Sequence, residues 1–236
     1  MRNIFYLNHL ILLFLFAFPT ISVKSQSEGN FDLGADFVSR YVWRGSDFAN
    51  SPSIQPYVSY SVKSFQAEIW GAFATTTDYQ EVDLVLSYQI NEMFTFQLTD
   101  YFFPNGTNFN NNYFDFSKKT TGHLMEGTIA FEGTDEIPLR VSANYNFYGN
   151  DPDKSWYFEM GYSGTVSEFS YEIFLGATPG KGVYLPDGSD GFKIINTGFS
   201  LSKEIKITDH FSLPVSGALI VNPQAENLFF VLGISL

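Results

Sequence analysis

The stretch Leu139-Arg-Val-Ser-Ala-Asn-Tyr-Asn-Phe147 alternates apolar and polar side chains without interruption. A period of two is typical of a β-strand with one apolar and one polar face. Similar rows recur along the chain, for example Val82-x-Leu84-x-Leu86-x-Tyr88 and Leu228-x-Phe230-x-Leu232-x-Ile234-x-Leu236. Together the rows predict an all-β chain of about twelve strands, each near the length of ~9–11 residues that crosses a bilayer when tilted.

The connections between these rows alternate in length. We expect short ones at Lys63-Ser64, Asn91-Glu92, Glu132–Glu136, Ser163–Glu168 and Lys203–His210. Longer ones are expected at Gly45–Pro52, Thr75–Gln80, Pro104–Thr121, Gly149–Lys154, Pro179–Gly191 and Asn222–Asn227. If the first strand starts in the periplasm, all short turns face the periplasm and all long loops face outward, as in an antiparallel up-and-down barrel of the outer membrane.

Residues 1–25 are predicted to be a secretory signal peptide rather than part of the fold. Arg2 supplies a positive start, Leu10–Phe18 is an apolar run, and Val23-Lys24-Ser25 is a small-residue cleavage site. The apolar run is too short to span a bilayer as a helix. Residues 26–236 are then expected to form one outer-membrane β-barrel.

The composition indicates which face of the strands points outward. Aromatic residues make up 18% of the chain and charged residues 16%, against about 25% charged in ordinary soluble domains. A soluble barrel of the lipocalin kind would also alternate, with its apolar row inside. Lys is nearly confined to turns, however, and aromatic residues gather at the row ends, as interfacial girdles do: Trp43, Tyr60, Phe73, Tyr88, Tyr101, Phe147 and Trp156. We therefore expect the apolar rows to face lipid, including Tyr41 and Trp43 in the first row and Ile195 in a later one.

Charge and residue counts exclude several functions. The formal net charge of −12 becomes −14 when Arg2 and Lys24 leave with the signal, which argues against nucleic acid as a partner. The chain has no Cys, so disulfides and thiol-held metals are excluded. Only His123 and His210 remain after signal removal, and their places in the sequence suggest no catalytic pair. We expect no enzymatic activity, no cofactor and no metal.

Several motifs resemble the TorF-type porin family of outer-membrane β-barrels. Ser39-Arg-Tyr-Val-Trp-Arg-Gly45 is similar to the opening strand of that family, and Phe65-Gln-Ala-Glu-Ile-Trp-Gly71 to its second hairpin. Glu81-Val-Asp-Leu-Val-Leu-Ser-Tyr88 and Asp100-Tyr-Phe-Phe-Pro104 are similar to later strands, and Glu126 stands where the family carries a Glu. The resemblance implies an outer-membrane barrel of porin type, without an agreed substrate.

With the apolar rows toward lipid, the charged residues of the strands line the lumen. The candidates are Asp32, Asp36, Arg40, Arg44, Glu68, Glu81, Asp83, Glu126, Arg140, Glu159 and Glu172. One interpretation is that the Arg side chains bridge carboxylates across a filled lumen. The other is a narrow aqueous path whose surplus carboxylates favour cations. The two interpretations are compatible.

Three features fit less simply. Asp100 shares the face of Phe96, Leu98 and Phe102, which suggests a bulge or a position beyond the membrane. The stretch Gly180–Gly191 follows no phosphate- or calcium-binding spacing and is expected to be turn chemistry. The Asn-rich segment Asn105–Asn112, with Tyr113, Phe114 and Phe116 after it, is either an exposed loop, a recognition loop or a segment that folds inward.

The sequence thus predicts a porin-like channel for small solutes or ions, possessing a narrow lumen that prefers cations. The alternative is a closed barrel with structural or surface-binding duties. In either case the expected partners are outer-membrane lipids and the periplasmic chaperone and barrel-assembly machinery.

Overall fold

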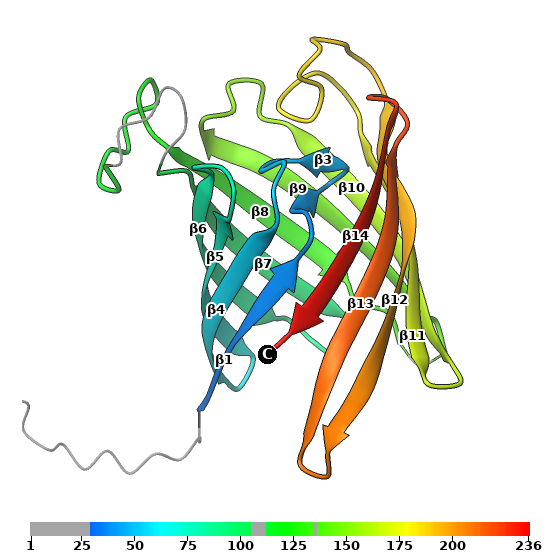
Figure 1. Ribbon diagram of the computed structural model, residues 1–236. Coiled ribbons are helices and arrows are strands. Elements are labelled where there is room, and N and C mark those ends of the chain that lie inside the picture. The colour runs from blue at the N-terminus through cyan, green and yellow to red at the C-terminus, as the bar shows by residue number, and fades with distance from the viewer. Residues whose placement is uncertain (1–28, 105–111, 135) are drawn as a thin grey trace, which may run out of the picture.

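The computed structural model describes residues 29–104, 112–134 and 136–236, and these residues form a closed antiparallel barrel of twelve strands (Figure 1). The predicted signal peptide and most of Asn105–Asn112 lie outside the described residues. The barrel strands are β1 (Asn30–Val38), β4 (Ser53–Val62), β5 (Phe65–Ala74), β6 (Gln80–Gln89), β7 (Phe94–Phe102), β8 (His123–Phe131), β9 (Leu139–Gly149), β10 (Trp156–Val166), β11 (Phe169–Thr178), β12 (Lys193–Thr208), β13 (Phe211–Asn222) and β14 (Asn227–Ser235). The predicted fold class and strand number are confirmed.

Each strand pairs with its neighbours along the chain, and β1 closes the barrel against β14. This seam is short: its register runs only from Asp36 opposite Ser235 to Val38 opposite Gly233. Reciprocal backbone hydrogen bonds of 3.0 Å between Ala35 and Leu236 extend it by one step. The longer connections all lie at one end of the barrel, which we call the loop end, and the short ones at the other, the turn end.

The barrel has an apolar outer face and a polar inner face. On β9, Val141 and Phe147 are 41% and 40% exposed, whereas Ser142 and Asn144, which point inward, are each 5% exposed. Exposed Leu, Ile, Val and Phe side chains continue around the outer face of the other strands. This arrangement is the reverse of a lipocalin-like barrel. Within the described part of the chain, no helix meets the length and hydropathy needed to span a membrane.

A short hairpin interrupts the path from β1 to β4. Its strands β2 (Val42–Trp43) and β3 (Ser46–Asp47) pair only with each other, and Arg44 and Gly45 between them have positive φ angles of 49° and 75°. The hairpin folds toward the barrel interior at the loop end (Figure 1). We call it the inward hairpin.

The prediction that two of the apolar rows face lipid is partly wrong. Tyr41 and Trp43 do not extend the outer row of β1, because that strand ends at Val38 and the chain turns into the barrel. Ile195 is also buried inside, although Ile194 beside it is exposed. A register shift at Gly176 and Ala177 leaves Ile195 as an extra residue in β12, and this bulge reverses the phase of the row.

The turn predicted at Lys203–His210 is also wrong. β12 continues to Thr208, and the reversal occurs at Asp209 and His210. The mixture of Lys and Glu suggested a turn, but Ile205 and Ile207 keep the strand alternation and are exposed on the outer face. β12 and β13 therefore form a long hairpin that extends beyond the neighbouring strands at the turn end (Figure 1).

Candidate functional site

The tip of the inward hairpin lies against β12 and β13. At Gly45 any Cβ would collide with the carbonyl oxygen of Ile195 on β12, and Asn222 Nδ2 of β13 donates to the Gly45 carbonyl at 3.1 Å. Glycine is needed here both for the positive φ and for this close approach. The tip of the hairpin is therefore fixed against strands that come much later in the chain.

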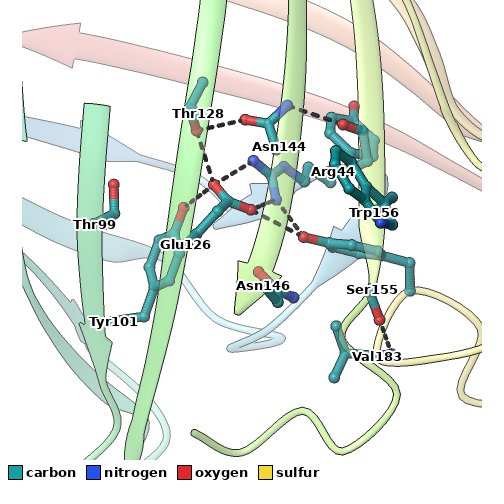
Figure 2. A network of polar contacts seen from close by, with 12 residues as sticks. Arg44, Thr99, Tyr101, Glu126, Thr128, Asn144, Asn146, Ser155, Trp156 and Val183 are labelled. Carbon is teal, nitrogen blue, oxygen red and sulfur yellow. Dashed lines mark hydrogen bonds and ion pairs between the residues drawn. The ribbon is translucent and has the colours of Figure 1, made fainter. Parts of the chain in front are cut away.

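An Arg–Glu pair anchors the hairpin on the opposite side of the lumen. Arg44 Nη1 and Nη2 lie 2.5 and 2.9 Å from Glu126 Oε2 and Oε1 on β8, a bidentate arrangement (Figure 2). Their side chains are only 10% and 1% exposed. Tyr101 on β7 donates a further hydrogen bond of 3.0 Å to Glu126 Oε1. The bidentate geometry and the added hydroxyl hydrogen bond compensate for the burial of this ion pair.

Aromatic rings surround the guanidinium of Arg44. Its Cζ lies 4.3 Å from the Trp43 ring centroid, 4.4 Å from that of Tyr157 on β10 and 5.4 Å from that of Tyr184. Rings within about 6 Å attract a cation through their quadrupole, more strongly where water is excluded. The rings thus hold the Arg44 side chain in place together with Glu126.

The loop after β11 also folds into the barrel. Tyr184 and Leu185 are buried against Tyr157 and Ile195, and the Tyr184 hydroxyl accepts from Arg44 and donates to Glu126 Oε2 at 3.3 Å. Burial raises the pKa of Tyr184, and so does the Glu126 carboxylate, whereas Arg44 lowers it. The hydroxyl therefore remains protonated and able to donate. The sequence predicted only turns in this loop, so the contribution of Tyr184 and Leu185 to the interior was missed.

A second cluster fills the lumen beside β5 and β6. Tyr41 and Ala49, which flank the inward hairpin, pack with Ala72, Trp70 and Tyr79. Next to this cluster, Glu81 accepts a hydrogen bond of 2.6 Å from Tyr79. Asp83, also buried, has one carboxylate oxygen without a hydrogen-bond partner among the described residues. Glu81 and Asp83 are thus buried beside the cluster around Tyr41, and their carboxylates are not exposed to the open part of the lumen.

The remaining lumen candidates are dispersed. Arg40 lies after β1 and pairs with Asp47 of the inward hairpin. Arg140 pairs at 3.2 Å with Glu132 at the turn end, where both are well exposed. On the inner face of other strands lie Asp32 and Asp36 on β1, Glu68 on β5, Glu159 on β10 and Glu172 on β11. Among the predicted lumen residues, only Arg44 and Glu126 form an ion pair with each other in the described part of the chain. Most of the other carboxylates lie on separate parts of the inner face.

A cavity of about 450 Å³ remains at the loop end on the β13–β14 side of the inward hairpin. Its lining combines polar side chains, among them Asp47, Asp187, Asn222, Gln224 and Asn227, with apolar ones such as Leu185 and Phe229. The backbone N–H and then the hydroxyl of Ser189 lower the pKa of Asp187 by hydrogen bonding, so its carboxylate is charged at the mouth. The hairpin therefore narrows the lumen and leaves a cavity beside β13 and β14, with charged and amide side chains in its lining.

The outer face carries a His–Asp pair that the sequence did not reveal. His123 Nδ1 lies 2.8 Å from Asp100 Oδ1, and its Nε2 lies 2.7 Å from the Tyr113 carbonyl. Both ring nitrogens therefore lie within hydrogen-bond distance of an oxygen. Asp100 thus has a hydrogen-bonding neighbour on the outer wall. The residues that follow the Asn-rich segment, Tyr113 and Phe116, pack on His123 outside the barrel, so this described part of the loop does not enter the pore.

Three tyrosines complete the site, Tyr101, Tyr157 and Tyr184, and none of them was a lumen candidate. Tyr101 was expected in the interfacial girdle, which is wrong, because its buried side chain binds Glu126 inside the barrel. Tyr101 and Tyr157 stand on the polar face of their rows, so their phase was a usable signal. Nothing in the local sequence marks Tyr184, because its contact with Arg44 joins residues 140 positions apart.

No protein-family model and no curated protein matches the sequence. A solved structure described as the KdgM porin is similar at 13% sequence identity, over 86% of this chain and 97% of that chain, with a TM-score of 0.51. A structure of the NanC porin matches at 11% identity over 86% of this chain and 98% of that one, with a TM-score of 0.47. At these identities the likeness to the KdgM porin shows that the chain has the fold of a small porin barrel.

Proposed function

We propose that the protein is an outer-membrane channel for small solutes or ions, narrowed at its loop end by the inward hairpin. The observation that carries this proposal is the closed barrel with an apolar exterior, whose polar bore is narrowed by the hairpin and still has a cavity at its mouth. A lipid-facing exterior explains why so many large apolar side chains are exposed. Secretion through the signal peptide at residues 1–25 and insertion by the barrel-assembly and periplasmic chaperone machinery belong to the same proposal.

The similarity to the KdgM porin structure supports the proposal through the barrel fold that it shares with this chain. The motifs at residues 39–45, 65–71 and 81–88 support a relation to the TorF-type porin family. In this chain the first motif has a structural meaning, because Arg44 and Gly45 form the tip of the inward hairpin.

Planar-bilayer recording of the refolded protein tests the channel directly. We expect small, steady conductance steps, because the hairpin and Tyr184 fill much of the loop end while polar side chains line the rest of the bore. Absence of any conductance in the inserted protein would favour the alternative, a closed barrel whose loops carry its function. The buried aromatic cluster around Arg44 is the observation that favours this alternative.

We further propose that the channel prefers cations. Arg44 is matched by Glu126, Arg40 by Asp47 and Arg140 by Glu132. These pairs leave Asp32, Asp36, Glu68 and Glu159 on the inner face without an Arg or Lys partner among the described residues, whereas Glu172 interacts electrostatically with Arg140 but forms no salt bridge with it. In a narrow bore an unmatched carboxylate acts on a passing ion more strongly than it does in bulk water.

The variant Glu68→Gln/Glu172→Gln is expected to conduct with a weaker preference for cations. Both side chains are partly exposed on the inner face, so the change removes charge from the path without breaking an ion pair. The reversal potential under a salt gradient measures the effect and should move toward zero. Glu92→Gln, in the turn between β6 and β7, is the control outside the bore. An anion-preferring wild-type pore would contradict the proposal.

The orientation of the barrel predicts which substituted cysteines are accessible. The chain has no native Cys, so single cysteines can be placed without background. Asp187→Cys, in the exposed loop after β11, should react with a membrane-impermeant maleimide on intact cells, whereas Thr208→Cys at the turn end should react only after the outer membrane is broken. The opposite labelling pattern would show that the orientation is reversed.

A further inference from the structure

Two positive charges without carboxylate partners, Lys118 and Lys154, lie together on the outer wall. Within the described ranges, Lys118, Lys119 and Lys154 form no ion pair, and neither do Lys63 and Lys193. The other six Lys and Arg side chains each contact a carboxylate: Arg40, Arg44, Arg140, Lys181, Lys203 and Lys206. In a chain of net charge −12, such an accumulation of unmatched positive charge is unexpected. It points to an anion supplied from outside the chain.

Lys118 and Lys154 line the same pocket. Its volume is about 330 Å³, and it lies at the loop end between the loop after β7 and the connection from β9 to β10. Phe147, Tyr148 and Asn150 also line it. One carboxylate, that of Asp151, belongs to the lining, but its oxygens accept hydrogen bonds from Asn146 Nδ2 at 2.9 Å and from the backbone N–H groups of Ser155 at 2.7 Å and Asp153 at 3.2 Å. Its charge is thus engaged within its own loop.

The loop that carries Lys118 is fixed against the outer wall beside the barrel (Figure 1). His123 binds the Tyr113 carbonyl, and the Phe116 ring stacks on the His123 ring with centroids 4.4 Å apart. Tyr148 of β9 donates to the Phe116 carbonyl, and Lys118 Nζ lies 5.8 Å from the Tyr148 ring centroid. These contacts place the lysine over β9 before any ligand arrives, which reduces the entropy cost of binding.

Below the pocket the outer wall is apolar and aromatic. Phe147 is exposed next to the lysines, and on β9 and β10 the rings of Tyr145, Trp156 and Phe158 form a stack with centroid distances of 4.5 and 5.9 Å. Exposed Trp and Tyr side chains are typical of the level where a membrane meets water. The pocket therefore has positive charge on its aqueous side and apolar surface on its membrane side.

We propose that this pocket binds the phosphate-bearing headgroup of a lipid in the leaflet at the loop end, with Lys118 and Lys154 at the phosphate and the acyl chains along Phe147 and the aromatic stack. The inference rests on the proposed membrane location, because only an embedded barrel presents this wall to lipid. Its ligand is a component of the membrane, and it is independent of what passes through the lumen.

Native mass spectrometry of the refolded protein with lipid A, a diphosphorylated glycolipid, tests the inference. We expect lipid A to remain bound, and dephosphorylated lipid A to bind much more weakly. Lys118→Gln/Lys154→Gln should lower the affinity about 25-fold, that is, roughly fivefold for each lysine near a membrane surface. Lys63→Gln/Lys206→Gln, which makes the same charge change at the turn end, should bind as the wild type does.

Lipid binding that does not depend on the two lysines, or on the phosphates, would overturn the inference. The inference would also be overturned if inorganic phosphate displaced bound lipid A as effectively as added free lipid A does, because the site would then be one for a free anion. The lysine variant should insert and conduct as the wild type does. Failure of every form to insert into bilayers would contradict the proposed function instead, which separates the two outcomes.

Discussion

Replacing Arg44 by alanine is expected to lower the free energy of unfolding by about 3–5 kcal/mol, the cost of leaving one partner of a buried ion pair uncompensated. Glu126 is 1% exposed and would keep only the hydroxyl hydrogen bonds of Tyr101, Thr128 and Tyr184. The variant also loses the cation–π contacts of Arg44 with Trp43, Tyr157 and Tyr184. Urea unfolding of the refolded barrel in lipid vesicles measures the change.

Two further variants make this result specific to the buried pair. Arg44→Ala/Glu126→Gln should recover part of the lost stability, because no unpaired charge is then buried. Arg140→Ala, which removes an exposed pair with Glu132, should cost no more than about 1 kcal/mol. Equal costs for Arg44→Ala and Arg140→Ala would show that the lumen around Glu126 is wet and that the hairpin is not anchored there.

Gly45→Val is expected to displace the inward hairpin and to increase the single-channel conductance. The position has φ +75°, and a Cβ there meets the carbonyl oxygen of Ile195. A β-branched residue in this left-handed conformation costs roughly 1–2 kcal/mol, and the collision adds to that cost. Because the barrel strands pair without the hairpin, the wall should stay closed while the loop end of the bore opens.

Gly188→Val is the matched control for Gly45→Val. Gly188 has nearly the same φ, +76°, but nothing lies within 4 Å of its Cβ position. Both variants carry the conformational cost, and only Gly45→Val carries the collision with β12. Planar-bilayer recording should therefore show a larger conductance for Gly45→Val alone. An unchanged conductance in both variants would mean that the hairpin does not limit the path. A silent wild type with a conducting Gly45→Val would mean that the hairpin closes the barrel.

Two kinds of charge on this barrel are distinguished by their surroundings. Arg44 and Glu126 are shielded from water and matched, so they fix the position of the inward hairpin. Lys118 and Lys154 are on the outer wall and unmatched within the described residues, so they remain available to a ligand. The first pair can be probed by stability and conductance, and the second by lipid binding.

The strand pattern was determined by the sequence itself. Leu139–Phe147 alternates with a period of two, and successive side chains of an extended strand point to opposite faces whatever the strand's partners are. The outer and inner faces, the strand number and the alternation of turns and loops could therefore be predicted. The lysines and aromatic residues of the outer wall are visible in the sequence, but their grouping depends on how the loop after β7 packs on β9.

Only the tertiary structure decided the inward hairpin and its anchor. Arg44 and Glu126 are 82 positions apart, and Arg44 and Tyr184 are 140 apart. Likewise, the bulge that turns Ile195 inward depends on the register of β11 with β12. Local alternation continues through Tyr41 and Trp43 and gives no sign that the chain leaves the wall there. The chain turns inward after Val38 because it gains buried aromatic packing and a bidentate ion pair there. These contacts exist only when the closed barrel has brought the distant strands together.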